Sequence, residues 1–439
     1  MSFINDPVAR FIALSLVGAI MVLFTLISLK RPWWATVGAI ASLPLIPFWA
    51  GYSVSVFFVS FHMALLAVAA FAVFLRERPT LRINLADLTV LVVFAITIAG
   101  VPLKLTTLSQ SYTFFQWMLA YWFARLVVSA YGLRRIIAAI SITFCIAAVA
   151  ILIEFAIGFN LWTRYFTFDN ALFARWSNLQ SRGGVLRAEG AFGHSIAAGG
   201  SLALAAILTL DAKLRTATRV LIVAVMCAAI LTTISRIGII TAALGIGMAV
   251  VFARTSPSLF SKIATLSVGT LGALVYSLFL VDVFTEAGTE ASNSAAYRFW
   301  LLDLLPYLEP FGQASSVTRS TAGDLSFGGY LSVDNAVLHF ALSNGWVATI
   351  ILFALMVAAT IRVLRLQAGV ATVALVATIP ALFTVALITQ YALVFWLVAG
   401  LAASEPSPTR DQRAPDEVAE SPSVTDSGRA LGVGPRKGD

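Results

Sequence analysis

The chain has 439 residues, of which 59% are hydrophobic and only 11% charged, and its mean hydropathy is +0.91. Soluble domains carry about a quarter charged residues, so this composition excludes an ordinary soluble protein and predicts many membrane spans. The formal net charge of +8 comes from basic residues spread among short loops, which is typical of the cytoplasmic side of membrane proteins and not of a nucleic-acid-binding patch.

The apolar runs predict an all-α, polytopic transmembrane bundle of about 12–13 spans, since each span needs about 20 apolar residues. The first run lacks a small-residue cleavage site, so we expect a retained span and not a removed signal peptide. The last two runs are also consistent with one long helix broken around 388–391. The predicted spans are 11–29, 33–50, 53–75, 85–103, 112–131, 136–158, 195–211, 220–235, 237–253, 263–281, 346–364, 370–387 and 389–403.

The basic loops predict the orientation of the spans. They fall on one side when the spans are counted in order, and the positive-inside rule makes that side cytoplasmic. The long connections 159–194 and 282–345 then lie outside. The chain is thus divided into amino-terminal helices (1–158), a region with both outer loops (159–404) and a polar tail (405–439) expected to be disordered in the cytoplasm. The basic loops are 76–82, 132–135, 211–219, 254–262 and 362–367.

Several motif classes are missing from the sequence. It has no nucleotide-binding loop, no dinucleotide fingerprint and no apparent internal repeat, and the lack of a repeat weakens a secondary-transporter reading. Cys145 and Cys227 both lie in apolar runs, so no disulfide framework is expected. The three histidines, His62, His194 and His339, are far apart in the sequence. We therefore expect neither a metal site nor a cofactor.

Arg187 stands in the stretch "VLRAEGAFGHS" (185–195), in the pattern R-x-x-G-x-F, with His194 at the mouth of the next predicted helix. The free N–H groups of a helix N-terminus favour an anion, and an arginine beside them completes a phosphate-binding combination. The alternative is an interfacial arginine that extends its head to water.

Two further arginines lie on the same predicted outer side. Arg236 sits between two apolar runs with almost no loop, where an ionisable residue usually has a partner, although an exposed hairpin turn is an equal alternative. Arg298 lies in the amphipathic "YRFWLLDLL", which predicts a short interfacial helix in the second long loop. An arginine that only anchors this helix at the interface is the alternative there.

Carboxylates and a histidine complete the candidates. Asp334 and Asn335 precede a predicted helix over 336–343, so they either cap it or, for Asp334, act as a general base. His339 has apolar neighbours and is expected to be packed, and His194 is a lower-ranked base. Glu154 lies late in the predicted span 136–158, and we expect it to pair with a nearby arginine.

The order of these motifs resembles the O-antigen ligase and polymerase family over residues 150–405: R-x-x-G-x-F before a span, "SR" between spans, "YRFW" then "EPFG", and "DN…NGW" entering a span. The resemblance implies an undecaprenyl-diphosphate-linked glycan donor and no metal or nucleotide. Arg187, Arg236 and Arg298 would contact the diphosphate. Ligases of this family have a histidine before the asparagine, whereas Asp334 stands here, as is common in polymerase-type members.

The expected function is a polysaccharide polymerase that joins undecaprenyl-diphosphate-linked repeat units on the outer face of the bacterial plasma membrane. Two alternatives stay open: a ligase that moves the glycan to a lipid or protein acceptor, and a transporter or flippase for an anionic lipid-linked glycan. The expected partners are membrane lipid, the lipid-linked glycan, a flippase and a chain-length regulator. Nucleic acid is not expected.

Overall fold

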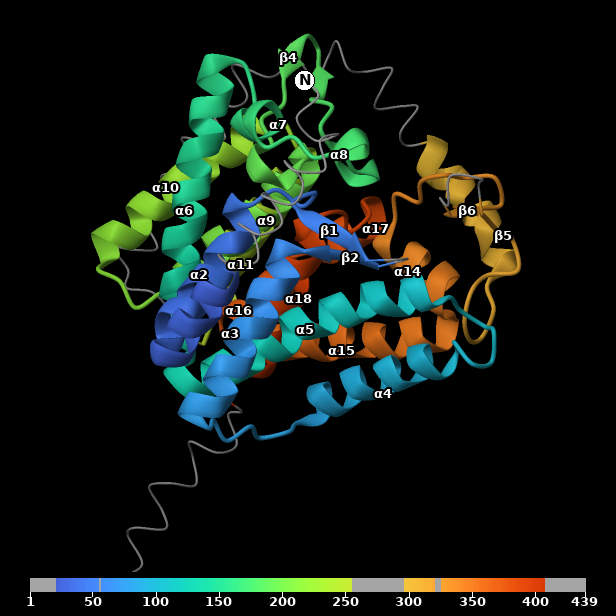
Figure 1. Cartoon of the computed structure of the whole chain (residues 1–439), viewed down its shortest axis with the longest axis horizontal. Coiled ribbons are helices and arrows are strands. Elements are labelled where there is room, and N and C mark those ends of the chain that lie inside the picture. The colour runs from blue at the N-terminus through green and yellow to red at the C-terminus, as the bar shows by residue number, and fades with distance from the viewer. Residues whose placement is uncertain (1–20, 55–56, 255–295, 320–324, 407–439) are drawn as a thin grey trace, which may run out of the picture. The chain divides into compact units, whose positions relative to one another are not determined.

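The computed structural model describes residues 21–54, 57–254, 296–319 and 325–406, which are mostly helical (Figure 1). Expectations for 11–20, for the span 263–281, for parts of the second long loop and for 407–439 lie outside the described residues. The described residues up to Glu405 belong to one compact unit. Glu405 accepts hydrogen bonds from the backbone amides of Gly369, Ala371 and Thr372, so its side chain caps the helix that begins at Val370.

Helices account for most of the described chain, which is also helical over Met21–Lys30. In chain order they are α2 (Pro32–Leu45), α3 (Phe61–Glu77), α4 (Leu85–Ala99), α5 (Leu108–Tyr131), α6 (Leu133–Ile157), α7 (Leu161–Tyr165), α8 (Ala171–Trp176), η1 (Gly190–Phe192), α9 (Ser195–Thr209), α10 (Thr216–Thr232), α11 (Arg236–Phe252), η2 (Leu301–Tyr307), α14 (Ala336–Asn344), α15 (Trp346–Leu364), α16 (Val370–Ala377), α17 (Ile379–Thr384) and α18 (Gln390–Ala403).

The strands form short antiparallel hairpins: β1 (Gly51–Val54) with β2 (Phe57–Ser60), β3 (Ser181–Arg182) with β4 (Val185–Leu186), and β5 (Val317–Arg319) with β6 (Leu325–Phe327). The first hairpin corrects the span predicted over 53–75. Its aromatic and β-branched residues favour strands. The helix starts only at Phe61, where the Ser60 side chain caps it by accepting a hydrogen bond from the Met63 amide.

Among the described residues, two helices, α6 and α15, are long and apolar enough to cross a membrane. The bounds of α15 match the predicted span 346–364. Other apolar helices are shorter, and the predicted span 370–387 is broken between α16 and α17. The break falls at Thr378, which places Pro380 in the first turn of α17, where its missing backbone N–H interrupts no hydrogen bond within that helix.

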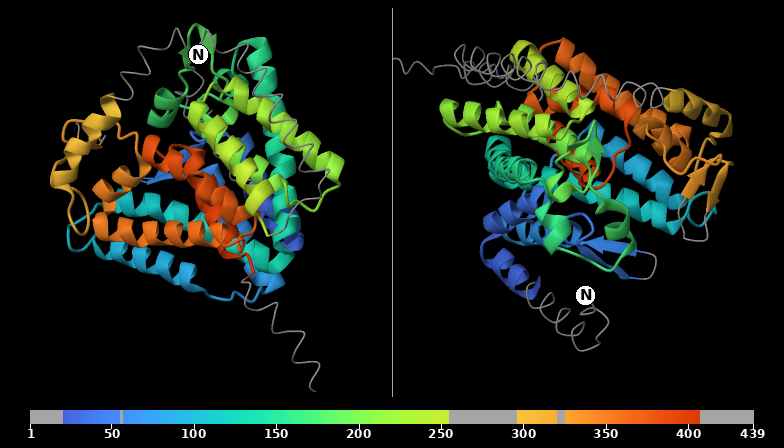
Figure 2. Two further views of the ribbon diagram at one scale, coloured as in Figure 1. Left: turned by 180° about the vertical axis from the view of Figure 1, so that it is seen from behind. Right: turned by 90° about the horizontal axis from the view of Figure 1, so that it is seen from above.

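Helix α9 lies at the centre of the described helices and packs against α6, α10, α11, α16 and α18 (Figures 1 and 2). Every residue of α9 except Ile196 is buried. It approaches α11 closely, since a Cβ placed on Gly238 would lie 2.8 Å from the backbone carbonyl carbon of Gly199. Small residues permit such backbone contact between helices, and this contact brings the start of α11 to the first turns of α9.

Candidate functional site

The N-terminal end of α9 is capped by His194, whose Nδ1 accepts a hydrogen bond of 3.1 Å from the Ile196 amide. This acceptor role requires an unprotonated Nδ1. Burial, aided by the charge of Arg187, lowers the pKa of His194 from 6.5 to about 4, so the ring is neutral at pH 7. Its other nitrogen lies 3.2 Å from the Gln180 amide nitrogen. His194 is therefore a helix cap linked to the neighbouring loop.

Glu154, near the end of α6, anchors the loop that leads into α9. Its carboxylate accepts hydrogen bonds of 2.9 Å from the backbone amides of Glu189 and Gly190, and one of 3.0 Å from the Asn160 side chain. These donors stand in place of the arginine that we expected as its partner. Because a buried carboxylate needs donors, the three contacts fix the loop against α6.

Arg187 is buried, with 6% of its surface exposed. Its Nε donates to the Thr233 carbonyl at 3.2 Å, and one terminal nitrogen donates to the Gln180 side-chain oxygen at 3.1 Å. The next amide, of Ala188, donates to the Thr232 carbonyl at 3.2 Å. Arg187 is thus held across the turn between α10 and α11 and does not extend into water.

Arg236 is the first residue of α11 and is exposed, three residues after the Thr233 carbonyl that holds Arg187. Arg182 donates to the Ile234 carbonyl of the same turn at 3.4 Å. The structure therefore brings the predicted residues Arg187 and Arg236 to one turn beside the first turns of α9, and adds Arg182. We call this turn, 232–236, with these three arginines the arginine turn.

Glu189 is a residue that the sequence reasoning missed. Its side chain is completely buried, and in the described part of the chain no hydrogen-bond partner reaches either carboxyl oxygen. An unsatisfied buried polar group costs about 1–3 kcal/mol. In the sequence, only its position two residues after Arg187 indicated a possible role. An isolated glutamate before a helix is more often exposed, so that position did not predict its burial.

The other predicted residues form a second group at the end of α17. The Arg298 Nε donates to the Thr384 carbonyl at 2.9 Å, and the Ala336 amide, directly after Asn335, donates to the Val385 carbonyl at 3.0 Å. Asp334 is partly exposed and accepts a hydrogen bond of 2.9 Å from the Ser332 hydroxyl. Residues 296–300 and η2 are helical, as predicted for this loop.

The capping prediction for Asn335 is confirmed, because its side chain accepts a 2.9 Å hydrogen bond from the Leu338 amide at the start of α14. His339 packs edge-on against Phe327, with ring centres 5.9 Å apart, but the residue is exposed, so the expectation of a packed histidine is met only in this one ring contact. Neither residue contacts the arginine turn in a hydrogen bond between described residues.

The two groups are joined by residues 384–390. The segment that holds Arg298 at Thr384 continues to Gln390, whose side-chain amide donates to the Ala191 carbonyl at 2.8 Å, two residues after Glu189. Six residues reach at most about 20 Å even when fully extended. Helix α17 also packs against α11, whose first residue is Arg236. Arg298 and Asp334 thus form a group distinct from the arginine turn but connected to it by this short segment.

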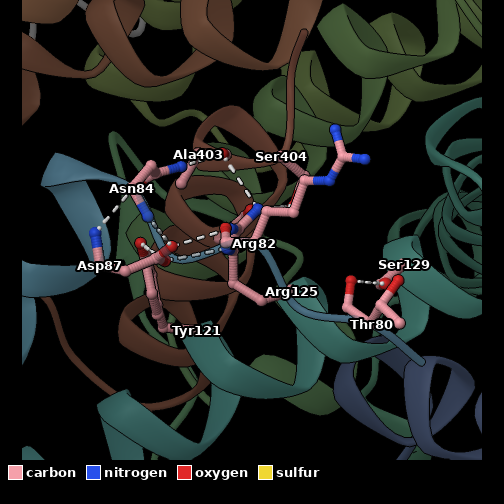
Figure 3. A network of polar contacts seen from close by, with 10 residues as sticks. Thr80, Arg82, Asn84, Asp87, Tyr121, Arg125, Ser129, Ala403 and Ser404 are labelled. Carbon is pink, nitrogen blue, oxygen red and sulfur yellow. Dashed lines mark hydrogen bonds and ion pairs between the residues drawn. The ribbon is translucent and has the colours of Figure 1, made fainter. Parts of the chain in front are cut away.

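A second buried charge cluster lies where α4 begins and α18 ends (Figure 3). Arg125 of α5 pairs with Asp87 of α4 through its Nε and a terminal nitrogen at 2.8 and 2.7 Å. It also donates to the carbonyls of Arg82 and Ala403 and to the Ser404 hydroxyl. We call Asp87 and Arg125 the buried clamp. In the sequence, the buried clamp was indicated by an arginine, Arg125, inside the predicted span 112–131.

Among the described residues, no group of three or more His, Cys, Asp and Glu side chains is placed to hold a metal ion. Comparison with models of protein families, with curated proteins and with solved structures gives no match for this chain.

Proposed function

We propose that the chain is a multi-pass membrane glycosyltransferase that joins undecaprenyl-diphosphate-linked oligosaccharides on the outer face of the bacterial plasma membrane. The proposal is carried by the buried guanidinium of Arg187, held by Thr233 and Gln180 next to the amino-terminal end of α9. A departing diphosphate gathers negative charge. Fixed guanidinium groups and helix N–H groups in a poorly hydrated site stabilise such charge.

Apolar outer faces of the helices support the membrane setting. On α6, the side chains of Ile142, Ile146, Val149 and Ile153 form one stripe, and each is between 45% and 53% exposed. On α15, only Ala348, Met356 and Val363 are buried. Continuous exposed apolar faces of this size are unfavourable in water and suit lipid.

Contacts between the basic loops support the orientation. The Lys213 amide donates to the Arg134 carbonyl at 3.2 Å, and the Arg254 amide to the Ala368 carbonyl at 2.9 Å, so distant basic loops lie together. Helix α6 starts at the first of these contacts and ends at the Glu154 anchor. With the basic side cytoplasmic, the arginine turn faces outward.

In the proposed reaction an acceptor hydroxyl attacks the anomeric carbon of the donor. The bond from that carbon to the diphosphate oxygen breaks, and the diphosphate leaves with the electron pair, stabilised by Arg187, Arg236 and Arg298. Asp334, already a hydrogen-bond acceptor for Ser332, takes the hydroxyl proton as general base.

The test uses purified full-length protein with an undecaprenyl-diphosphate oligosaccharide in EDTA. We expect longer glycan and released undecaprenyl diphosphate. Arg187→Ala should lower the rate roughly 10²–10³-fold, which is typical for loss of one preorganised donor. Arg134→Ala is the matched control, because this arginine is 57% exposed in an ion pair with Asp211 among the basic loops.

Full activity of Arg187→Ala, or a strict need for Mg²⁺, would contradict the proposal. A transporter would instead move lipid-linked glycan across proteoliposomes without forming a bond. Transfer to a lipid or protein acceptor, with no chain lengthening, would identify a ligase.

A further inference from the structure

Two buried glutamates meet at the entrance to α9. The backbone amide of Glu189 donates to the Glu154 carboxylate at 2.9 Å, so the two residues are in direct contact. The Glu154 oxygens receive three N–H donors in all, whereas the Glu189 oxygens have no hydrogen-bond partner among the described residues. The two acids therefore have opposite surroundings within one small volume.

This difference in surroundings indicates which of the two carboxyl groups carries a proton. A carboxylate that accepts several N–H bonds is stabilised in its charged form, whereas a buried carboxyl without donors is not. Two adjacent buried acids also resist being ionised together. Burial, with the nearby charge of Glu154, raises the pKa of Glu189 well above its usual value, and Arg187 opposes this only in part. Glu154 is the ionised member of the pair and Glu189 carries the proton.

The other elements around η1 add few charges. Helix α2 contains no charged residue, and α18 contributes the neutral Gln390 through its bond to Ala191. His194 at the start of α9 is neutral at pH 7. The titratable and charged side chains on Glu189's own loop are Arg164, Tyr165, Asp169, Arg175, Arg182, Arg187 and His194. The elements around it add Arg134, Arg135, Cys145 and Glu154 from α6, Arg236 from α11 and Tyr391 from α18. Of these, Glu154 and Arg187 act on the Glu189 carboxyl.

We propose that Glu189 is a proton-binding residue that sets the charge of a diphosphate site at Arg187. When Glu189 is protonated, it adds no negative charge beside Arg187; when it is ionised, it adds one negative charge there, which opposes the binding of an anion. The diphosphate as ligand rests on the proposed function, whereas the proton on Glu189 does not. Binding of the anion to the ionised form takes up one proton from solvent, and its release frees that proton.

The first experiment examines the proton itself, in full-length protein at neutral pH. Infrared spectroscopy should detect the carbonyl stretch of a buried protonated carboxylic acid, which shifts in D₂O. Glu189→Gln should abolish this band. The exposed Glu77 provides the matched control, and Glu77→Gln should leave the band unchanged. A band that persists in Glu189→Gln would overturn the assignment.

The second experiment measures the affinity for inorganic pyrophosphate by calorimetry across a pH series. Wild-type affinity should fall above the pKa of Glu189, by up to tenfold per pH unit. Glu189→Gln should keep the low-pH affinity and lose that fall. Pyrophosphate changes its own charge with pH, but this change is common to both proteins and cancels in their comparison. The same pH dependence in both proteins would overturn the linkage.

A second variant, Arg187→Gln, keeps the linkage between Glu189 and anion binding testable if Glu189→Gln does not fold. Arg187→Gln should bind pyrophosphate weakly at every pH, because it lacks the positive charge beside Glu189. An unchanged pH dependence in Arg187→Gln would also contradict the linkage. If pyrophosphate binds no form of the protein but the infrared band depends on Glu189, the proton assignment stands, and the linkage and the diphosphate site of the proposed function both fail.

Discussion

The described part of the chain contains two buried sites in which an acid lies near an arginine, and they are built in opposite ways. In the buried clamp, every nitrogen of Arg125 donates and both oxygens of Asp87 accept (Figure 3). At the entrance to α9, Arg187 donates to the Thr233 carbonyl and the Gln180 side chain, and the nearby Glu189 carboxyl has no hydrogen-bond partner in the described part of the chain. In the first arrangement the acid and the arginine bind each other and hold helices together, whereas in the second the acid has no hydrogen-bond donor among the described residues.

The physical reason is the cost of desolvation. A buried ion pair is tolerated only when its remaining lone pairs and protons are also satisfied, and the clamp meets this condition across α4, α5 and the end of α18. At the entrance to α9 the Glu189 carboxyl does not meet this condition among the described residues, which costs stability. Functional sites commonly carry such local costs.

The largest expected effect is on the clamp. Asp87→Asn leaves the Arg125 charge buried without its counter-charge, which should lower the free energy of unfolding by about 3–5 kcal/mol. The measurement is thermal or denaturant unfolding in detergent. Arg134→Ala is the control, since an exposed ion pair contributes about 0–1 kcal/mol. Equal losses in the two variants would show that the clamp is not structural.

Local signals in the sequence predicted much of the fold. The bounds of α15, the start of α9 at Ser195 and the cap at Asn335 all follow from apolar length and capping residues. The first hairpin was missed, because a short apolar run of aromatic and β-branched residues does not distinguish a strand from part of a helix.

The tertiary contacts at the site were not predictable in the same way. Asp87 and Arg125 are 38 residues apart, and Glu154 reaches the Glu189 amide across 35 residues. No pattern among neighbouring residues in the sequence indicates which of these distant groups come into contact. The sequence singled out Arg187 by its motif, but the burial of Glu189 follows from the bond between its loop and α6. The position of Arg125 inside a predicted apolar span was a usable signal for a buried partner.

A smaller effect is expected at the anchor of the loop. Glu154→Gln replaces one accepting oxygen by an NH₂ group, which faces an N–H donor of Glu189 or of Gly190 and Asn160. Leaving buried donors unsatisfied should cost about 1–3 kcal/mol of unfolding free energy. Glu77→Gln, at an exposed position, serves as the control. A loss of unfolding free energy as large as that of Asp87→Asn would show that the Glu154 anchor stabilises the fold as strongly as the buried clamp does.

The smallest effect should come from Glu189→Gln at pH 5, where the wild-type carboxyl is already neutral, and we expect a change within about 0.5 kcal/mol. Because the pKa of Glu189 is raised in the folded protein, the native state keeps a proton that the unfolded chain releases above its ordinary value of 4.5. Wild-type stability relative to the variant therefore falls as pH rises, by up to about 1.4 kcal/mol per unit, until the folded-state pKa is passed. Unfolding curves of both proteins from pH 5 to 8 measure this difference. Parallel curves would mean that Glu189 loses its proton at the same pH in the folded and the unfolded protein, and the contrast between the two sites would disappear.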